Sequence, residues 1–273
     1  MKSIFDSITP YGIMTLIAFI VCISIIVFLA RRKNMFNEEL IFVMISAFIG
    51  GFLGAHILYF LVGLPDFISG LSLNPPVDVG DFLLKVYYAA SGLVYYGGLL
   101  GALLGIWIYC HAKKIPLHPT LNLFAVIFPL FHGLGRIGCV LTGCCYGIEY
   151  HGIFAITYDE SAIVEGLNDH IVDFPRFPVQ PLEALLEFIM FAVLLTLYLK
   201  RGDKFSVLPP YLLAYAVIRF FDEFLRGDEI RGIFGPFSTS QWIAIFVFII
   251  TLIYLLVRRS KKNNNPDAFA KEL

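Results

Sequence analysis

Charged residues are scarce in this 273-residue chain: Asp, Glu, Lys and Arg together make up 15% of it, against about 25% in soluble domains. Such a composition excludes an intrinsically disordered protein, which needs many charges to stay solvated. The 20 basic residues do not outnumber the 21 acidic ones, so no basic surplus remains to neutralise nucleic-acid phosphates. Five cysteines in so long a chain also exclude a small secreted fold held together by disulfides.

Apolar residues are abundant instead, at 58% of the chain with 27 Phe. Seven apolar runs are each long enough to cross the roughly 30 Å of hydrocarbon in a bilayer. They cover residues 11–30, 40–63, 92–110, 121–142, 183–200, 208–225 and 241–257. We therefore predict an all-α polytopic membrane protein with about seven transmembrane helices, in which residues 1–273 form a single integral membrane domain. The first run lacks a small-residue cleavage pattern, which favours a retained anchor over a signal peptide.

The positions of the basic residues predict the orientation of the chain. Lys and Arg gather at 31–33, 113–114, 200–204 and 258–262, on alternate connections between the runs. Cytoplasmic connections are the ones that carry such an excess, so we expect the N-terminus outside and residues 260–273 as a cytoplasmic tail. Two long connections, 64–91 and 143–182, then form extracytoplasmic loop regions. The second contains a strand-like stretch at 152–158 and is either a surface cap or a functional loop, as long loops often are.

Glycines recur every four residues in two of the runs, at Gly50 and Gly54 and at Gly97, Gly101 and Gly105. Small residues at this spacing let two helices approach closely in lipid. Gly97 and Gly98 also follow two tyrosines at the outer end of a run, where a ligand could approach the backbone. The spacing alone does not separate packing from ligand binding.

Two arginines lie within or at the edge of apolar runs, Arg136 and Arg219. An arginine at the centre of a span costs about 2.5–3.5 kcal/mol on insertion scales, so such residues are normally paired or functional. An offset of four residues places His132 on the helix face of Arg136, and the same offset places Tyr215 and Glu223 on the face of Arg219.

Two interpretations of these arginines remain open. The first is a pair of structural ion pairs, with Glu183 or Glu223 as the partner. The second is an anion site, in which both guanidinium groups bind a lipid phosphate near the outer headgroups. Glu183 and Glu187, four residues apart at the start of the fifth run, would orient the guanidinium groups.

The five cysteines fall into two groups. Cys22 and Cys110 lie within runs and are expected to behave as small apolar residues. Cys139, Cys144 and Cys145 follow one another at the outer end of the fourth run, where they are inert, act as a functional thiol or thiolate, or bind metal. A zinc site normally has four ligands with C-x2–4-C spacing, so three cysteines are weak evidence for a metal site.

Several motifs resemble the prolipoprotein diacylglyceryl transferases of the bacterial plasma membrane. The resemblance runs from Tyr11-Gly12 to about Gln241. Its most specific stretch is Gly135-Arg136-Ile137-Gly138, followed by Gly143 and Tyr146-Gly147. Three further matches are the Gly97-Gly98 pair, Pro178-Val179-Gln180 with Glu183, and the series Tyr215, Arg219, Glu223 and Arg226.

The chain also departs from the family pattern. Tyr96 stands where the family has a histidine before Gly-Gly, and His56 stands for an arginine usual in the second span. Cys139, Thr142 and Cys144 stand for two asparagines and a glutamate. The arginines that would hold phosphate are kept, while the residues that would supply acid–base chemistry are replaced.

The resemblance implies transfer of a diacylglyceryl group from phosphatidylglycerol to the cysteine thiol of a prolipoprotein lipobox, in a multi-pass protein of the bacterial plasma (inner) membrane. The expected partners are phosphatidylglycerol, the prolipoprotein signal peptide and membrane lipids, with no cofactor and no metal. Two alternatives are a paralogue that uses the cysteines for thiol or acyl transfer to another acceptor, and a non-enzymatic phospholipid-binding or transport protein.

Residue chemistry and resemblance together give a set of candidate site residues. Tyr96 is a poor base at neutral pH unless a neighbouring arginine lowers its pKa, and His132 is the candidate replacement. The expected catalytic residues are Tyr96, His132, Arg219, Glu223 and Cys144. The expected lipid- and phosphate-binding residues are Tyr11, Gly97, Gly98, Arg136, Glu183, Tyr215 and Arg219.

Overall fold

The computed structural model describes residues 9–158, 174–201, 206–228 and 232–264. Residues 159–173 of the predicted loop region and 265–273 of the predicted tail therefore lie outside the described residues. The chain divides into two compact units: residues 1–33, 122–231 and 240–273 form the first, and residues 34–121 and 232–239 form the second.

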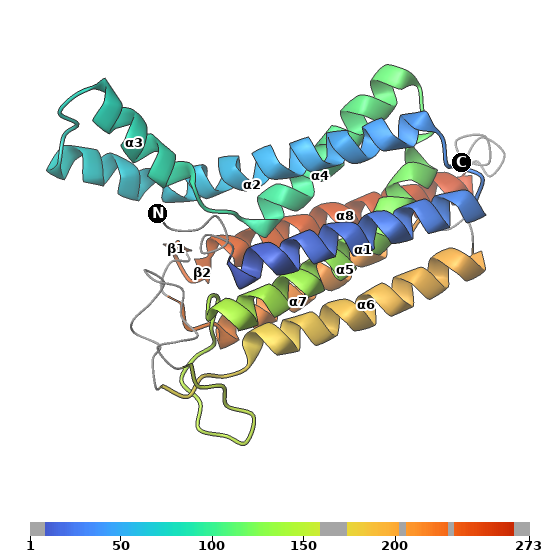
Figure 1. The fold of residues 1–273 in the computed structure, drawn as a ribbon. Coiled ribbons are helices and arrows are strands. Elements are labelled where there is room, and N and C mark those ends of the chain that lie inside the picture. Colours follow the sequence, from blue (N-terminus) through green and yellow to red (C-terminus); the bar gives the residue numbers. More distant parts are fainter. Residues whose placement is uncertain (1–8, 159–173, 202–205, 229–231, 265–273) are drawn as a thin grey trace. The chain divides into compact units, whose positions relative to one another are not determined.

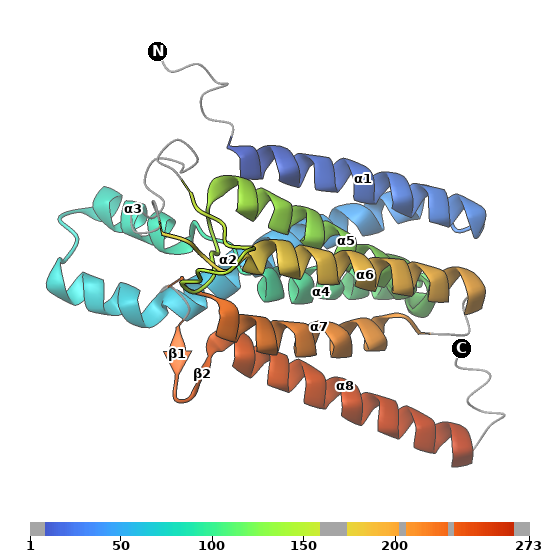
Figure 2. The same ribbon diagram turned by 90° about the horizontal axis from the view of Figure 1, so that it is seen from below.

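The first unit is a helical bundle whose members run side by side in both ribbon views (Figures 1 and 2). It contains most of α5 and α8 together with three complete helices and a 3-10 turn. Their bounds are α1 Pro10–Arg32, α5 Leu117–Thr142, α6 Val179–Arg201, α7 Leu208–Asp222, η4 Glu223–Leu225 and α8 Thr239–Asn264. Thr9 caps α1 by accepting a hydrogen bond from the Gly12 amide at 3.1 Å, with Pro10 in the first turn, where its missing amide hydrogen is not needed.

The second unit contains α2 (Glu38–Leu73), α3 (Val79–Ala90), α4 (Tyr95–Lys113) and a short antiparallel pair, β1 (Ile233–Phe234) with β2 (Phe237–Ser238). Asn37 caps α2 by accepting from the Leu40 amide at 2.9 Å. Helix α2 then continues through Pro65. The predicted first loop, 64–91, is therefore mostly helical. The apolar run at 40–63 predicted the first part of α2, but the helix continues past Pro65 to Leu73.

The glycine repeats lie where α2 and α4 pack together. A Cβ atom added to Gly101 would overlap the carbonyl oxygen of Gly50, and one added to Gly97 would overlap that of Gly54. The backbones therefore touch directly, as small residues at four-residue spacing allow. The packing interpretation of these glycines is correct, and it includes Gly97.

We expect Gly101→Ala to destabilise the chain by about 1–3 kcal/mol, because the new methyl group forces the two backbones apart. Gly63→Ala is a matched control, since nothing lies within 4 Å of a Cβ added at this position of α2. Thermal unfolding in detergent compares the two variants. Equal midpoints for both would contradict the direct backbone contact.

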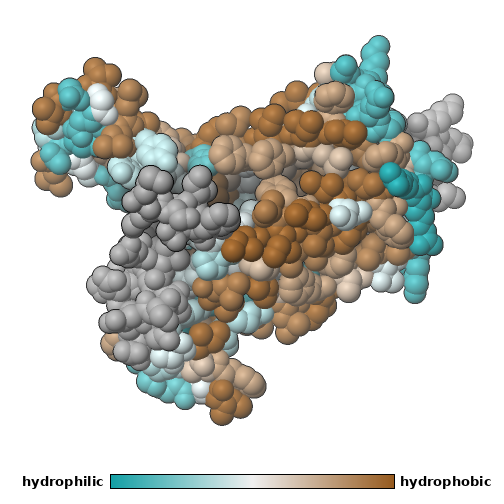
Figure 3. Space-filling model, in the orientation of Figure 1, coloured by the Kyte–Doolittle hydropathy of each residue, from teal (hydrophilic) through white to brown (hydrophobic). Residues whose placement is uncertain are grey.

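Among the described residues, five helices are long and apolar enough by themselves to cross a membrane: α1, α2, α5, α6 and α8. A bent pair, α3 with α4, makes a sixth candidate, with an angle of 91° between its members. Apolar side chains cover the visible lengths of the helices, and hydrophilic ones gather at helix ends (Figure 3). The chain is thus an all-α, multi-pass membrane protein, as predicted. Helix α7 has only 15 residues, so a count of seven spans stays a prediction, as does the orientation.

Residues 143–158 and 174–178 of the 143–182 region are mostly extended chain with isolated bridges, while residues 179–182 begin α6. Arg176 pairs with both Glu149 and Ile156, and Gly147 pairs with Arg226. The strand-like stretch at 152–158 therefore contributes a bridge at Ile156 instead of a full strand. These bridges attach the region to the end of the first unit that carries the start of α6 and the end of η4.

Candidate functional site

Arg136 and Glu183 form a buried, two-point ion pair between α5 and α6. The Arg136 Nε lies 2.8 Å from Glu183 Oε2, and its Nη2 donates to Glu183 Oε1 at 3.0 Å. The two residues are 7% and 1% exposed. The two contacts hold the Arg136 guanidinium group in one orientation. Glu183 does not use all five N–H donors of this group, so donors remain for a further acceptor.

His132 lies one helical turn before Arg136 and contacts two carboxylates. Its Nδ1 is 3.0 Å from Glu187 Oε1, and its Nε2 is 3.4 Å from Glu183 Oε1. The edge of its ring packs on Tyr215 with a centroid distance of 5.3 Å, which connects α5 to α7. The face predicted from the four-residue offset thus carries a continuous polar network.

Arg219 on α7 has two acidic partners that follow it in the sequence. Its Nη1 is 3.1 Å from Asp222 Oδ2, and its Nη2 is 2.6 Å from Glu223 Oε2. The Nη2 also donates to Ser240 Oγ at 3.2 Å. Sequence reasoning named Glu223 but left out Asp222, although its i+3 position relative to Arg219 was a signal that could have identified it.

The network contains more carboxylates than guanidinium groups. Two arginines face four buried acids, Glu183, Glu187, Asp222 and Glu223. A buried carboxylate is tolerated in a membrane only when it is paired or neutralised. Glu183 pairs with Arg136, and Asp222 and Glu223 pair with Arg219, while Glu187 contacts His132.

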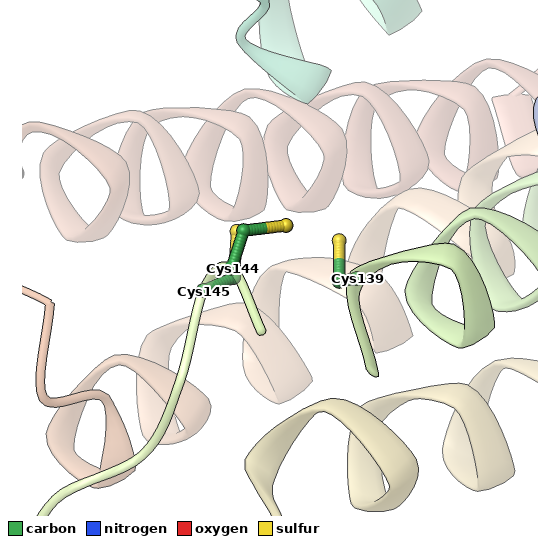
Figure 4. A group of neighbouring side chains, drawn as sticks. All are labelled: Cys139, Cys144 and Cys145. Atoms are coloured by element: carbon green, nitrogen blue, oxygen red, sulfur yellow. The ribbon is translucent and has the colours of Figure 1, made fainter. Parts of the chain in front are cut away.

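The three cysteines at the end of α5 come together in space. Their sulfur atoms all lie within 4.8 Å of one another, and Figure 4 shows Cys139 on the helix and the Cys144-Cys145 pair on the segment that follows. Gly143 ends the helix in the left-handed region with φ 67°, and the Cys144 amide returns to the Cys139 carbonyl at 3.2 Å. This helix-ending turn brings the later thiols back to Cys139.

The cluster is held by further contacts. Gln180 Nε2 donates to the Cys144 carbonyl oxygen at 2.9 Å, and Thr142 Oγ1 lies 3.3 Å from Cys144 Sγ. Hydrogen bonds from Cys139 and Cys144, together with the charges of Arg226 and Arg136, lower the pKa of the Cys145 thiol well below its usual value. The hydrogen bond from Cys139 also lowers the pKa of the Cys144 thiol. The hydrogen bond between Cys144 and Cys145, together with burial, outweighs this effect and raises the Cys144 pKa to about 11.

The other candidate residues fall into both units. Tyr11 on α1 lies against α5, since a Cβ added to Gly138 would be 3.1 Å from the Tyr11 ring. Tyr96, Gly97 and Gly98 belong to α4 in the second unit, where Tyr96 is 2% exposed. The structure therefore brings together His132, Arg136, Glu183 and Tyr215, with Arg219 on the same helix as Tyr215 and Glu223 in the 3-10 turn that follows it.

Comparison with known proteins decides the family. The sequence model of the prolipoprotein diacylglyceryl transferases matches residues 3–257. The chain belongs to this family. A protein named phosphatidylglycerol–prolipoprotein diacylglyceryl transferase from Clostridium tetani is 32% identical over 257 residues, covering 92% of this chain and 94% of the relative.

Two more relatives of the diacylglyceryl transferase family have similar coverage. A protein named phosphatidylglycerol–prolipoprotein diacylglyceryl transferase 2, from Clostridium perfringens, is 29% identical over 92% of this chain and 91% of its own length. A protein named phosphatidylglycerol–prolipoprotein diacylglyceryl transferase, from Chlorobaculum tepidum, is 27% identical over 94% of this chain and 88% of its own length. The polar network and the cysteine cluster both lie within the part that matches the diacylglyceryl transferase family.

Proposed function

We propose that this chain transfers the diacylglyceryl group of phosphatidylglycerol to the lipobox cysteine of prolipoproteins in the bacterial plasma membrane. The observation that carries the proposal is the pair of buried arginines, Arg136 and Arg219, each held by carboxylates in the helical first unit. Such a site suits a lipid donor whose reacting end is an anionic phosphate. Its position within the family match supports the same reaction, for which the relatives are named.

The reaction is a substitution at carbon. The acceptor thiol loses its proton, the sulfur forms a bond to the glyceryl carbon, and the bond from that carbon to the phosphate oxygen breaks. Glycerol phosphate leaves with the electron pair. Fixed guanidinium donors stabilise the charge that develops on the leaving oxygen, and they do so most strongly where water is excluded.

The contacts suggest a role for each residue of the network. Arg136 and Arg219 bind the phosphate, while Glu183 and Glu223 position their guanidinium groups. His132, placed between two carboxylates, and Tyr96 are the acid–base candidates. Tyr11 and Tyr215 of the first unit and Gly98 of the second are the candidates for contact with the lipid, while Gly97 packs against Gly54.

A depletion strain tests the function directly. The gene for this chain should restore growth and lipoprotein modification in bacteria depleted of their own transferase, and an Arg136→Ala variant should not. Purified chain should also release glycerol phosphate from phosphatidylglycerol only when a lipobox peptide with a cysteine is present. If the purified chain binds phosphatidylglycerol but releases no glycerol phosphate, and the gene does not restore growth, the enzyme is refuted and a lipid-binding protein is favoured.

The orientation is part of the proposal, because the basic residues place the 143–182 region outside the cytoplasm. In a variant without the native cysteines, Ile153→Cys should react with an impermeant thiol reagent in intact cells, because Ile153 is 91% exposed in the proposed outer loop. Ala112→Cys, beside the basic end of α4, should react only after the cells are opened. Labelling of Ala112→Cys in intact cells would reverse the orientation.

A further inference from the structure

The cysteine cluster is the feature of the first unit that the polar network leaves without a role. Cys139 is 6% exposed, and the other two thiols are half-buried. Three sulfur atoms within 4.8 Å of one another are close to the separation that metal coordination requires. A Zn–S bond of about 2.3 Å in tetrahedral geometry places the sulfur atoms about 3.8 Å apart.

The backbone around the cluster is shaped to present these thiols. Cys145 adopts φ 55°, a left-handed conformation that costs a residue with a side chain about 1–3 kcal/mol and persists where surrounding contacts enforce it. The enforcing contacts are present: the Cys144 carbonyl accepts from Gln180 at 2.9 Å, and the Tyr146 carbonyl accepts from the Gly227 amide at 2.9 Å. Strain of this kind tends to occur at functional sites.

Charge also suits a metal–thiolate centre here. A divalent ion with three thiolates carries a net charge of −1, and the positive charges of Arg226 and Arg136 act on the Cys145 sulfur. The other group that could hold a metal among the described residues, His132 with Glu183 and Glu187, is less suitable. Glu183 is already paired with Arg136, whose positive charge opposes a cation at that place.

We propose that Cys139, Cys144 and Cys145 bind Zn²⁺ through three thiolates, and that the fourth coordination position takes the acceptor cysteine. Zinc sites with three protein ligands and one open position are the catalytic type, while structural sites are closed by four. The ion site follows from the cysteines alone, whereas the role of the acceptor rests on the proposed function. This proposal departs from the expectation of no metal.

The transfer needs no reactant beyond the lipid, the acceptor thiol and a hydroxide on the zinc ion. A hydroxide on the open position takes the proton of the acceptor thiol and leaves as water, so that the acceptor binds as a thiolate. The bound sulfur attacks the glyceryl carbon, the carbon–oxygen bond breaks, and glycerol phosphate leaves with the electron pair. The resulting thioether is neutral, binds zinc weakly and is released. A metal-bound thiol is deprotonated at neutral pH, so the centre supplies the nucleophile.

Arg136 is close enough to the cysteine cluster to bind the phosphate of the lipid whose carbon the sulfur attacks. It precedes Cys139 by three residues on α5, which is about 4.5 Å of helix rise on one helix face. A phosphate on Arg136 and a sulfur on the metal would therefore lie within about a helical turn of each other. This spacing suits a carbon attached to the phosphate through one oxygen.

The first experiment measures the metal without any transfer reaction. Purified full-length chain, reduced and loaded with Zn²⁺ and then with Co²⁺, should bind one ion per chain, with the near-ultraviolet absorption of a thiolate–Co²⁺ bond. Cys144→Ser and Cys139→Ser should each weaken binding by more than the roughly 10–100-fold that loss of an outer-shell partner costs. Cys22→Ser and Cys110→Ser are matched controls, buried elsewhere in the chain, and should bind normally.

The second experiment asks whether the open position takes the acceptor. A lipobox peptide with its cysteine should shift the Co²⁺ spectrum, and the same peptide with serine should not. In the transfer assay, Cys144→Ser should lose turnover at neutral pH while its affinity for phosphatidylglycerol vesicles stays unchanged.

The outcomes separate the two proposals. No metal in the wild-type chain, or a disulfide between cluster cysteines after purification under reducing conditions, would overturn the zinc site. Metal binding with full turnover in Cys144→Ser would overturn its catalytic role. Metal binding with a peptide-dependent shift but no transfer in the wild type would support the site and refute the proposed function instead.

Discussion

Arg219→Lys is expected to lower turnover by about 10²-fold, the cost of losing one fixed donor that stabilises developing charge. The Nη1 of Arg219 contacts Asp222, and its Nη2 contacts both Glu223 and Ser240. Lysine supplies one compact charge where a planar group makes several contacts at set angles. It cannot hold both carboxylates and a phosphate in the same geometry.

The measurement is steady-state transfer from phosphatidylglycerol to a lipobox peptide, with kcat and KM determined separately. Because the positive charge is kept, the variant should fold, which its thermal midpoint checks. Arg31→Lys at the exposed end of α1 is the control and should be silent. Wild-type kcat and KM in Arg219→Lys would rule out planar recognition of the phosphate.

Glu183→Gln should be the most destabilising single change in the network, by about 3–5 kcal/mol, because it leaves Arg136 as a buried charge without its counter-charge. Glutamine is close in size and still accepts a hydrogen bond, so the loss isolates the charge. Turnover should fall as well, since Arg136 loses the two-point contact that orients it. The control is Glu149→Gln, whose pairing with His151 is largely exposed and contributes little.

A double variant separates stability from chemistry. Arg136→Gln with Glu183→Gln removes both charges of the pair, so we expect it to recover most of the stability lost in Glu183→Gln. Transfer should remain absent, because no guanidinium is left to bind phosphate. Recovery of turnover together with stability would show that the pair is purely structural.

The helices long enough to cross a membrane were largely predictable, because each follows from an apolar run. The run at 121–142 became α5, Leu117–Thr142, and the run at 183–200 became α6, Val179–Arg201. The structure of 64–91 was not predictable from hydropathy, since a helix that leaves the hydrocarbon no longer needs apolar residues all round. Asp78 shows how it forms, by capping α3 through the Asp81 amide at 2.7 Å.

The contacts of the site were predictable only where they are local. Arg219 and Glu223 are one turn apart, so their pairing follows from helix geometry. The pairing of Arg136 with Glu183 joins two helices, and sequence offered it as one of several options. The cysteine cluster depends on a left-handed turn at Gly143 and Cys145, and a non-glycine residue in that conformation leaves little trace in the sequence.

The length of α2 has a consequence for how the chain meets the bilayer. Its 36 residues extend about 54 Å, whereas the hydrocarbon is about 30 Å thick. About 24 Å of the helix, over two fifths of its length, must therefore lie outside the hydrocarbon unless the helix tilts. The part after Pro65 exposes Ile68 and Leu73. Helix α3 of the same unit exposes Tyr87 and Tyr88, residues that favour the headgroup level. We therefore expect the α2–α3 hairpin to lie at the membrane interface and to set the depth of the second unit in the bilayer.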